Sequence, residues 1–230
     1  MYTRILAKQR TVHPNLTLRL ASGGYIGGGL YHSQTIEGAL TSIPGARIVY
    51  PSFADDAAGL LRTSIRSKGF TVFLEPKAQY NSVEAAGFVP EDFEVPFGKA
   101  VSAAGHDLSV ITYGNTTHFC LSVAEKLKKE HNWDVEVIDI RSLIPLDTET
   151  IFASVKKTGK VLIVHEDKVF SGFGAEIAGI VGTEMFRYLD APIQRVGSTF
   201  TPVGFHPVLE KAILPGEERI YNAAKALLEY

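Results

Sequence analysis

This chain of 230 residues is 45% hydrophobic and 21% charged, with a formal net charge of −2. These proportions are typical of globular proteins and exclude wholesale disorder, and the near-neutral balance excludes nucleic acid as the main partner. Cys120 is the sole cysteine, which excludes an intrachain disulfide and favours a reducing compartment. The sequence has no apolar run of the roughly 20 residues that a membrane span needs, so we predict a soluble cytoplasmic protein.

Short apolar segments recur along the chain, and helical patterns separate them. Several of them, such as Val161–Val164, are apolar on both faces, which is typical of strands in a buried parallel sheet. The expected strands are Leu16–Leu20, Arg47–Tyr50, Thr71–Glu75, Leu108–Tyr113, Val135–Ile140, Val161–Glu166 and Ile193–Val196. The alternation of strands and helices predicts βαβ units and an α/β fold with a mostly parallel sheet.

Residues that favour helix ends mark the intervening helices. Ser52 resembles the first residue of a capping box, and Thr116 or Thr117 is expected to cap the next helix. Asp147 is expected to start a third helix. A further apolar pattern predicts one continuous helix over Phe173–Tyr188, and an amphipathic helix closes the chain.

Periodicity disappears between Asn81 and Gly98, where glycine, proline, asparagine and acidic residues accumulate. We interpret residues 81–98 as a linker between a first domain, 1–80, and a second domain, 99–230. The first domain is thin for an autonomous α/β domain, which typically has about 100–150 residues. We therefore expect residues 1 to 30 to be poorly ordered or rearranged.

The most distinctive segment begins with the glycine run Gly27–Gly29, which leads into the polar triplet His32-Ser33-Gln34. Glycines allow a backbone to approach a ligand or another chain closely, and an imidazole can exchange protons near pH 7. The run lacks the Gly-Lys-Ser/Thr of a P-loop and the spacing of a dinucleotide turn. We interpret it as close backbone packing at a subunit interface or under a cofactor.

Together with Ile43–Pro51, Phe73–Lys77 and Ile138–Asp147, this segment closely resembles the beta-type half of the thiamine-diphosphate-dependent 2-oxoacid dehydrogenases, most of all the branched-chain (2-oxoisovalerate) type. The resemblance implies a truncated pyrimidine-binding domain over residues 1–80 and a transketolase C-terminal-like α/β domain over 99–230. It also implies that roughly a hundred residues are missing upstream, a domain-sized deficit. In the family, that portion carries the glutamate that activates the cofactor. We therefore expect the C-terminal part of a larger enzyme.

The same resemblance implies site residues. His32 matches the family's active-site histidine, which supports proton transfer during decarboxylation and acyl transfer to lipoyl-lysine. An imidazole is chemically suited to this task. The alternative interpretation is a helix-capping or structural histidine. Tyr31 and Gln34 match as pocket-lining residues at the cofactor, with plain packing roles as their alternative.

The cofactor implied for the complete enzyme is thiamine diphosphate with Mg²⁺. In the family an alpha-type subunit, or a fused alpha-like region, holds its diphosphate and metal, so we do not expect this chain alone to bind it. The other implied partners are a lipoyl acyltransferase and a second copy of the chain in a two-fold dimer.

Related proteins often bind a structural potassium ion at a helix end, where Ser64 and Ile65 could supply backbone carbonyls. Ser67 and Gly69 stand where the family often has an acidic residue and an amide. A hard cation needs several oxygen ligands, so this difference speaks against the site.

Other candidate residues have simpler explanations. His165 and Glu166 end a buried strand, a position that often faces a cleft in α/β proteins. Arg141 is expected to form a structural ion pair. Gly172–Ala175 is a partial dinucleotide pattern without a correctly spaced acidic residue, so NAD binding is not expected. The remaining histidines show no metal-ligand spacing.

Three functions are consistent with these residues. The first is the beta-type portion of a 2-oxoacid dehydrogenase, inactive when alone. The second is a relative of transketolase or deoxyxylulose-phosphate synthase, which would need arginines and histidines gathered for a sugar phosphate. The third is a non-catalytic module that dimerises and docks the acyltransferase. Addition of the upstream region and an alpha-type partner distinguishes them, because restored activity indicates a catalytic half and binding alone indicates a scaffold.

Overall fold

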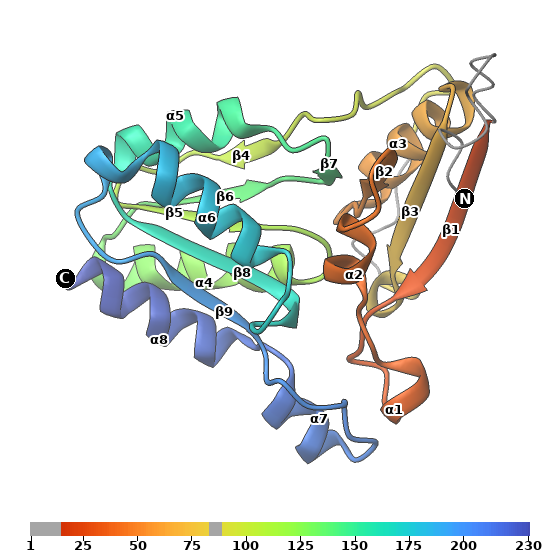
Figure 1. Cartoon of the computed structure of the whole chain (residues 1–230). Helices are drawn as coiled ribbons and strands as arrows, with labels where there is room; N and C mark the ends of the chain where they lie inside the picture. The colour runs from red at the N-terminus through yellow and green to blue at the C-terminus, as the bar shows by residue number, and fades with distance from the viewer. Residues whose placement is uncertain (1–14, 83–88) are drawn as a thin grey trace.

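The computed structural model describes residues 15–82 and 89–230. Within these ranges the strands form two sheets, and helices pack against both (Figure 1). The predicted α/β fold with mostly parallel sheets is therefore confirmed. Residues 1–14, which belong to the segment expected to be poorly ordered, lie outside the described residues.

The smaller sheet is formed mainly by the N-terminal part of the chain. Its strands, in spatial order, are β1 (Leu16–Ser22), β3 (Phe70–Pro76), β2 (Ala46–Val49) and β7 (Ser142–Ile144). β1 and β2 both run parallel to β3, whereas β7 arrives from much later in the sequence and pairs antiparallel with β2. Helix α3 (Ala54–Arg66) packs on this sheet through Leu60, which lies in one apolar cluster with Phe73.

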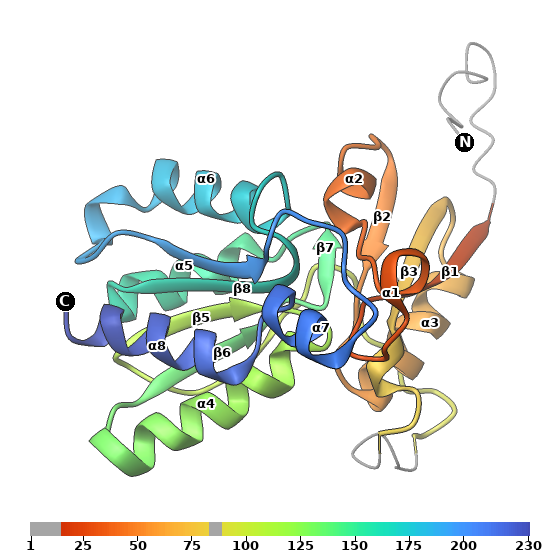
Figure 2. The same cartoon turned by 90° about the horizontal axis from the view of Figure 1, so that it is seen from below.

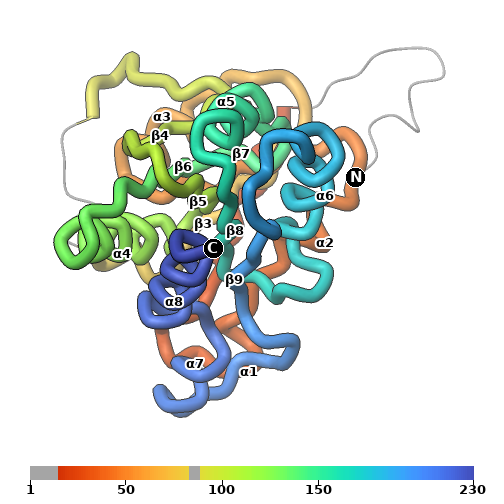
Figure 3. The backbone as a smooth tube through the Cα atoms, turned by 90° about the vertical axis from the view of Figure 1, so that its left-hand side faces the viewer, coloured from red at the N-terminus to blue at the C-terminus, as the bar shows by residue number. Residues whose placement is uncertain are grey.

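The larger sheet is formed entirely by the C-terminal part of the chain. Its strands, in spatial order, are β4 (Val101–Ala103), β6 (Val135–Asp139), β5 (Leu108–Thr112), β8 (Val161–Lys168) and β9 (Gln194–Ser198). β4 is antiparallel to β6, and the other pairs are parallel. Helices α5 (Thr148–Thr158) and α6 (Gly174–Glu184) lie on one face, and α4 (Thr116–His131) and α8 (Glu217–Leu228) on the other (Figures 1 and 3).

One hydrophobic cluster joins the two sheets. Ile48 and Leu74 of the smaller sheet lie in the same buried cluster as Ile111 and Ile163 of the larger sheet. All four side chains are fully buried. Because this apolar surface is removed from water only while both sheets are in place, each sheet stabilises the other.

The predicted ion pair of Arg141 is present and buried. Its guanidinium donates to the Asp56 carboxylate at 2.6 Å and to the Lys99 carbonyl at 2.8 Å. Asp56 belongs to α3, so this pair fastens the C-terminal part of the chain to the helix of the smaller sheet.

The remaining elements are short. They are α1 (Gly29–His32), α2 (Glu37–Thr41), the 3-10 turns η1 (Lys77–Gln79) and η3 (Phe186–Tyr188), and α7 (Pro207–Ile213). α1 follows β1, α7 follows β9, and the two helices lie side by side at one end of the molecule (Figure 2). This end brings the glycine run of the N-terminal part of the chain against α7 of the C-terminal part.

Several predicted helix ends differ from the structure. Ser52 does not cap α3, whose N-cap is Phe53, because the Ser52 hydroxyl pairs with that of Thr117 at 2.8 Å. Neither candidate threonine caps α4, which begins after Asn115. Asp147 does cap α5, with its carboxylate accepting from the Thr150 N–H at 3.1 Å.

The helix predicted over Phe173–Tyr188 is interrupted. α6 ends at Glu184, and η3 follows. The Asp190 N–H donates to the Gly159 carbonyl at 2.8 Å, which ties the chain after α6 to the end of α5. The helix must therefore stop early so that the chain can turn back into β9.

Part of the segment interpreted as a linker packs against α3. The Arg62 guanidinium donates to the Pro90 carbonyl at 2.7 Å, and Val95 is buried beside Leu60. Residues 83–88 lie outside the described residues. The two short antiparallel strands, β4 and β7, were absent from the predicted set.

Candidate functional site

The segment Gly23–Gln34, which we call the glycine loop, leaves the carboxyl end of β1 and contains α1. Its backbone alternates between conformations, with positive φ at Gly23 (94°), Tyr25 (62°), Gly27 (66°) and Gly29 (61°). Such alternation turns successive N–H groups toward one side and makes a concavity that attracts anions. The glycine-rich sequence is needed here because other residues rarely adopt left-handed φ.

Two buried carboxylates of the C-terminal part accept hydrogen bonds from this loop. Glu166 of β8 accepts from the Gly24 N–H. Glu210 of α7 accepts from the N–H groups of Ile26 and Gly27, each at 3.2 Å. The loop is therefore attached to both β8 and α7.

His32 is the last residue of α1, and its side chain is exposed. Among the described residues, its imidazole has no hydrogen-bond or ring partner. Its carbonyl accepts a hydrogen bond from the Lys77 ammonium, a cation placed favourably at the end of a helical turn. The ring is thus exposed to solvent, while the backbone of the same residue is held by the hydrogen bond from Lys77.

The other two loop residues predicted at the site differ in environment. Tyr31 is 89% exposed. Gln34 is half-buried, and its side-chain oxygen accepts from the Lys168 ammonium at 3.0 Å. Tyr31 directly precedes His32 and Gln34 follows it by two residues, and none of the three lines the apolar cavity described next.

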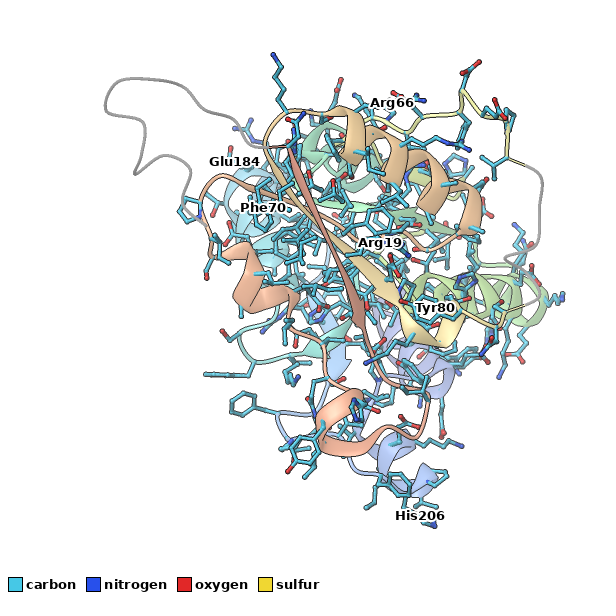
Figure 4. The ribbon with its side chains drawn as sticks, turned by 90° about the vertical axis from the view of Figure 1, so that its right-hand side faces the viewer. Arg19, Arg66, Phe70, Tyr80, Glu184 and His206 are labelled. Atoms are coloured by element: carbon cyan, nitrogen blue, oxygen red, sulfur yellow. The ribbon has the colours of Figure 1, made fainter. Side chains whose placement is uncertain are left out.

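A well-formed apolar cavity lies elsewhere. Its volume is about 320 Å³, and it lies between the start of α3, the middle of β1 and the end of β3, with Phe53, Phe73 and His118 among its lining residues. At its rim, Arg19 pairs with Glu75, and the Tyr80 hydroxyl donates to the same carboxylate at 2.6 Å. Figure 4 shows Arg19 and Tyr80 on this side of the smaller sheet, away from His206 beside α7.

A buried group of acidic residues lies between the two parts of the chain. The Glu37 carboxylate, wholly inaccessible to solvent, accepts from the Tyr113 hydroxyl at 3.3 Å. Burial raises the pKa of Glu37 well above its usual range, and the charge of Asp167 raises it further. Asp167 in turn accepts from the Gly38 N–H and so holds the start of α2.

His165 does not face a cleft, as its position at a strand end had suggested. It is fully buried, its ring is stacked on that of Tyr113 at 6.2 Å, and burial lowers its pKa to about 4. The backbones of Gly172 and Gly174 close over this ring so tightly that an added Cβ would overlap it. The imidazole is thus a neutral core group.

Glu166 is also buried, and burial raises its pKa to about 7. Its role as a backbone acceptor was not foreseen from the sequence. Neither was that of Glu210, which no local pattern links to the loop because it follows the loop by more than 170 residues. Lys77 could have been found, since it ends one of the motifs that carry the family resemblance.

The candidate cation ligands lie in a different region. Ser64 and Ile65 are in the last turn of α3, where the Ser64 hydroxyl donates to the Leu60 carbonyl at 2.7 Å. Potassium binding by their carbonyls stays a prediction. In the described ranges, no cluster of three or more His, Cys, Asp or Glu side chains is arranged to hold a metal, and no helix is both long and apolar enough to cross a membrane.

Two family patterns match the chain. The pattern of the transketolase C-terminal domain matches residues 98–220, more than half of its length. The chain belongs to this family. The pattern of the transketolase pyrimidine-binding domain matches residues 2–83. The family order is thus a pyrimidine-binding part followed by a C-terminal domain, as the resemblance implied.

Individual relatives agree with this membership. The chain is 38% identical over 218 residues to the 2-oxoisovalerate dehydrogenase subunit beta of Bacillus subtilis, covering 94% of this chain and 66% of that protein. It is 40% identical over 230 residues to the Pseudomonas aeruginosa protein of the same name, covering 93% and 64%. It is also 38% identical to the acetoin:2,6-dichlorophenolindophenol oxidoreductase subunit beta of Bacillus subtilis, covering 93% and 62%.

A solved structure supports the fold. It is described as a split gene transketolase, inactive beta4 tetramer, and it matches 94% of this chain and 67% of its own with a TM-score of 0.74 at 20% identity. The chain spans about 65% of the length of the curated relatives it matches.

Proposed function

We propose that this chain is the beta-type portion of the decarboxylating component of a 2-oxoacid dehydrogenase, acting on branched-chain substrates. The observation that carries the proposal is the exposed His32 at the end of a glycine loop, in a chain whose relatives include subunits named for 2-oxoisovalerate. The transketolase family patterns support a thiamine-diphosphate enzyme.

In this proposal His32 acts as a proton donor and acceptor at the reacting substrate. Its exposed ring supports this role, because a general acid–base group must reach the atom it serves. Tyr31 and Gln34 would line the substrate side of the same wall. A structural histidine, by contrast, is expected to show ring partners like those of His165.

The described residues do not by themselves fit a complete thiamine diphosphate site. They offer no metal-holding cluster, and His32 is exposed to solvent. They fit one wall of such a site. We propose that the diphosphate and Mg²⁺ are held by an alpha-type subunit or a fused alpha-like region, with upstream beta-type residues completing the pyrimidine contacts.

The surface beside His32 supports a protein partner at this end of the molecule. Phe205 packs beside Gly29 yet is 75% exposed, and Phe200 is 71% exposed and contacts the ring of Phe170. Exposed apolar patches of this kind mark interaction sites. We propose the alpha-type partner and a second copy of the chain as the neighbours, with lipoyl acyltransferase as the acyl acceptor and the cytoplasm as the compartment.

The domain limits remain those proposed from the sequence: a partial pyrimidine-binding domain at 1–80, a linker at 81–98 and the C-terminal domain at 99–230. The matched family patterns, which end at residue 83 and begin at residue 98, support these limits.

The test is a reconstituted assembly. The chain, supplied with an upstream beta-type region, an alpha-type subunit, thiamine diphosphate and Mg²⁺, should decarboxylate 2-oxoisovalerate and acylate a lipoyl domain. Pyruvate serves as the comparison substrate, because pyruvate dehydrogenase beta subunits are also among the relatives. Transfer from sugar phosphates without 2-oxoacid turnover would favour the transketolase alternative. Binding without turnover of either class would favour the non-catalytic module.

A further inference from the structure

The glycine loop is wrapped around the carboxylate of Glu210. One oxygen accepts from the Ile26 and Gly27 N–H groups at 3.2 Å each and faces the Ser33 hydroxyl at 3.4 Å, and the other oxygen lies 3.3 Å from the Gly27 nitrogen. The Ser33 hydroxyl also accepts from the Gly28 N–H at 3.0 Å. Glu210 is 9% exposed, so these contacts are largely shielded from water.

Glu210 therefore contacts the loop on both sides of α1. Ile26 and Gly27 precede this helix, and Ser33 follows it directly after His32. α1 is only four residues long and has no side-chain cap. A single helical turn is not stable on its own, because the ordering of its first turn costs more than one hydrogen bond returns. The direction in which α1 presents His32 must then be fixed by contacts from outside the turn.

We propose that Glu210 is a positioning residue for His32, holding the glycine loop in the conformation that directs the imidazole toward the substrate. The effect of Glu210 on catalysis rests on the proposed function. The anchoring of the loop does not, because it is a property of the folded chain. Glu210 and His32 do not touch, and Glu210 acts through the loop backbone.

Other contacts make Glu210 the central anchor rather than one of several equal ones. In the described residues, the Glu166 carboxylate accepts from Gly24, near the start of the loop. The Lys77 ammonium donates to the carbonyl of His32. The Gly23 N–H donates to the Gln34 carbonyl at 3.2 Å and closes the base of the loop. Among the described side chains outside the loop, Glu210 is the one that hydrogen-bonds to the loop both before and after α1. Its removal would leave two N–H groups and a hydroxyl without their acceptor.

The first experiment measures hydrogen exchange in the full chain, without any activity assay. In Glu210→Ala, amides of the glycine loop should exchange about tenfold faster than in the wild type, while those of α8 keep their protection. Glu210→Gln retains a side-chain oxygen and should recover most of the protection. Glu184→Ala is the matched control, since this exposed residue at the end of α6 lies away from α1 (Figure 4).

Ser33→Ala provides a second test if Glu210→Ala fails to fold. This change removes only the hydroxyl that bridges Gly28 and Glu210, and it should raise loop exchange by a smaller factor in the same direction. If Glu210→Ala folds and its loop amides exchange at the wild-type rate, the anchoring is overturned. If Glu210→Ala is unfolded, a wild-type rate of loop exchange in Ser33→Ala overturns it.

The second experiment uses the reconstituted enzyme. Glu210→Ala should lower kcat about tenfold with little change in KM for the 2-oxo acid, because the substrate still binds but the imidazole is misdirected. Glu210→Gln should restore most of kcat. Faster loop exchange with unchanged kcat overturns the positioning role. By contrast, wild-type turnover in His32→Ala overturns the proposed function while leaving the loop anchoring supported by exchange.

Discussion

Two histidines of this chain experience opposite environments. The ring of His32 is exposed at the end of α1, whereas the ring of His165 is enclosed in the core against Tyr113. Of these two side chains, His32 is thus the one accessible to a molecule in solution and the one with fewer contacts. Mutation of His32 should therefore lower turnover without a comparable change in the free energy of unfolding.

In a reconstituted assembly, His32→Ala should lower turnover by roughly two to four orders of magnitude, the usual contribution of a general acid–base group. The free energy of unfolding should change by less than about 0.5 kcal/mol, because the exposed ring has no described partner to lose. Steady-state rates with a lipoyl acceptor and urea denaturation measure the two quantities. His106→Ala, another exposed histidine, is the control. Equal rates for the two variants would contradict the assignment.

Glu166 should make the stability of the chain depend on pH. Burial raises the pKa of its carboxyl from 4.5 to about 7, and the charge of Glu210 raises it further, although Gly24 and Lys77 oppose the shift. Folding therefore favours the protonated form. The stabilising contribution is complete below about pH 4.5 and is lost as the pH rises to about 7, a change of roughly 3 kcal/mol.

Glu166→Gln removes this titration, so the stability of the wild type relative to the variant should fall between pH 5 and pH 8. Urea denaturation at both values measures the difference. Asp139, whose pKa burial also raises to about 7, titrates in both proteins and cancels in the comparison. Parallel stability profiles for the two proteins would show that Glu166 is ionised throughout.

At the scale of elements, local patterns predicted the parallel strands because both faces of these strands are buried. They failed for β4 and β7, each three residues long, since these strands are defined by pairing with β6 and β2 and not by their own composition. Among helix caps, Asp147 was predicted correctly. Ser52 was not, because its hydroxyl is used in a tertiary contact with Thr117 that no local pattern encodes.

The same distinction applies to the site. His32 was assigned from the contiguous motif around it, and its catalytic role stays a prediction. The acceptors that hold its loop come from β8 and α7, and only the three-dimensional fold brings them to it. Glu37 is similar, because its burial depends on the packing of α2 against Asp167 and Tyr113.

Asp147 joins two elements and should be a sensitive position. Its carboxylate caps α5 through the Thr150 N–H and also accepts from the Ala100 N–H at 2.9 Å. Asp147→Ala should lower the free energy of unfolding by about 1–2 kcal/mol, as for the loss of other N-caps. Asp147→Asn keeps one acceptor oxygen for the Thr150 N–H and replaces the oxygen that accepts from Ala100 with an amide nitrogen, so it should lose only a part of this. Urea denaturation at pH 7 measures both, and equal losses would contradict a contribution from the helix cap itself.

At the scale of the whole molecule, we expect the isolated chain to bind thiamine diphosphate more weakly than micromolar and to have negligible decarboxylase activity. In the proposed function the described residues supply one wall of the site, and half a site cannot hold a cofactor in a reactive geometry. Titration calorimetry with Mg²⁺ present measures this. Micromolar binding by the chain alone would show that the diphosphate ligands are present after all.

The isolated chain should also form a symmetric dimer. β1 lies at the edge of the smaller sheet in the described structure, and bare strand edges and exposed aromatic residues favour association. Light scattering at micromolar concentration should give twice the mass of the chain. A strictly monomeric chain would mean that these surfaces are not partner surfaces.

The antiparallel pairing of β7 with β2 has a consequence for how the protein is made. The smaller sheet lacks its last strand until residues 142–144 have left the ribosome, although β2 itself ends at Val49. Domains usually fold in the order of synthesis, N-terminal first. Here the smaller sheet can be completed only after β4, β5 and β6 of the larger sheet have also been synthesised, because these strands precede β7 in the chain.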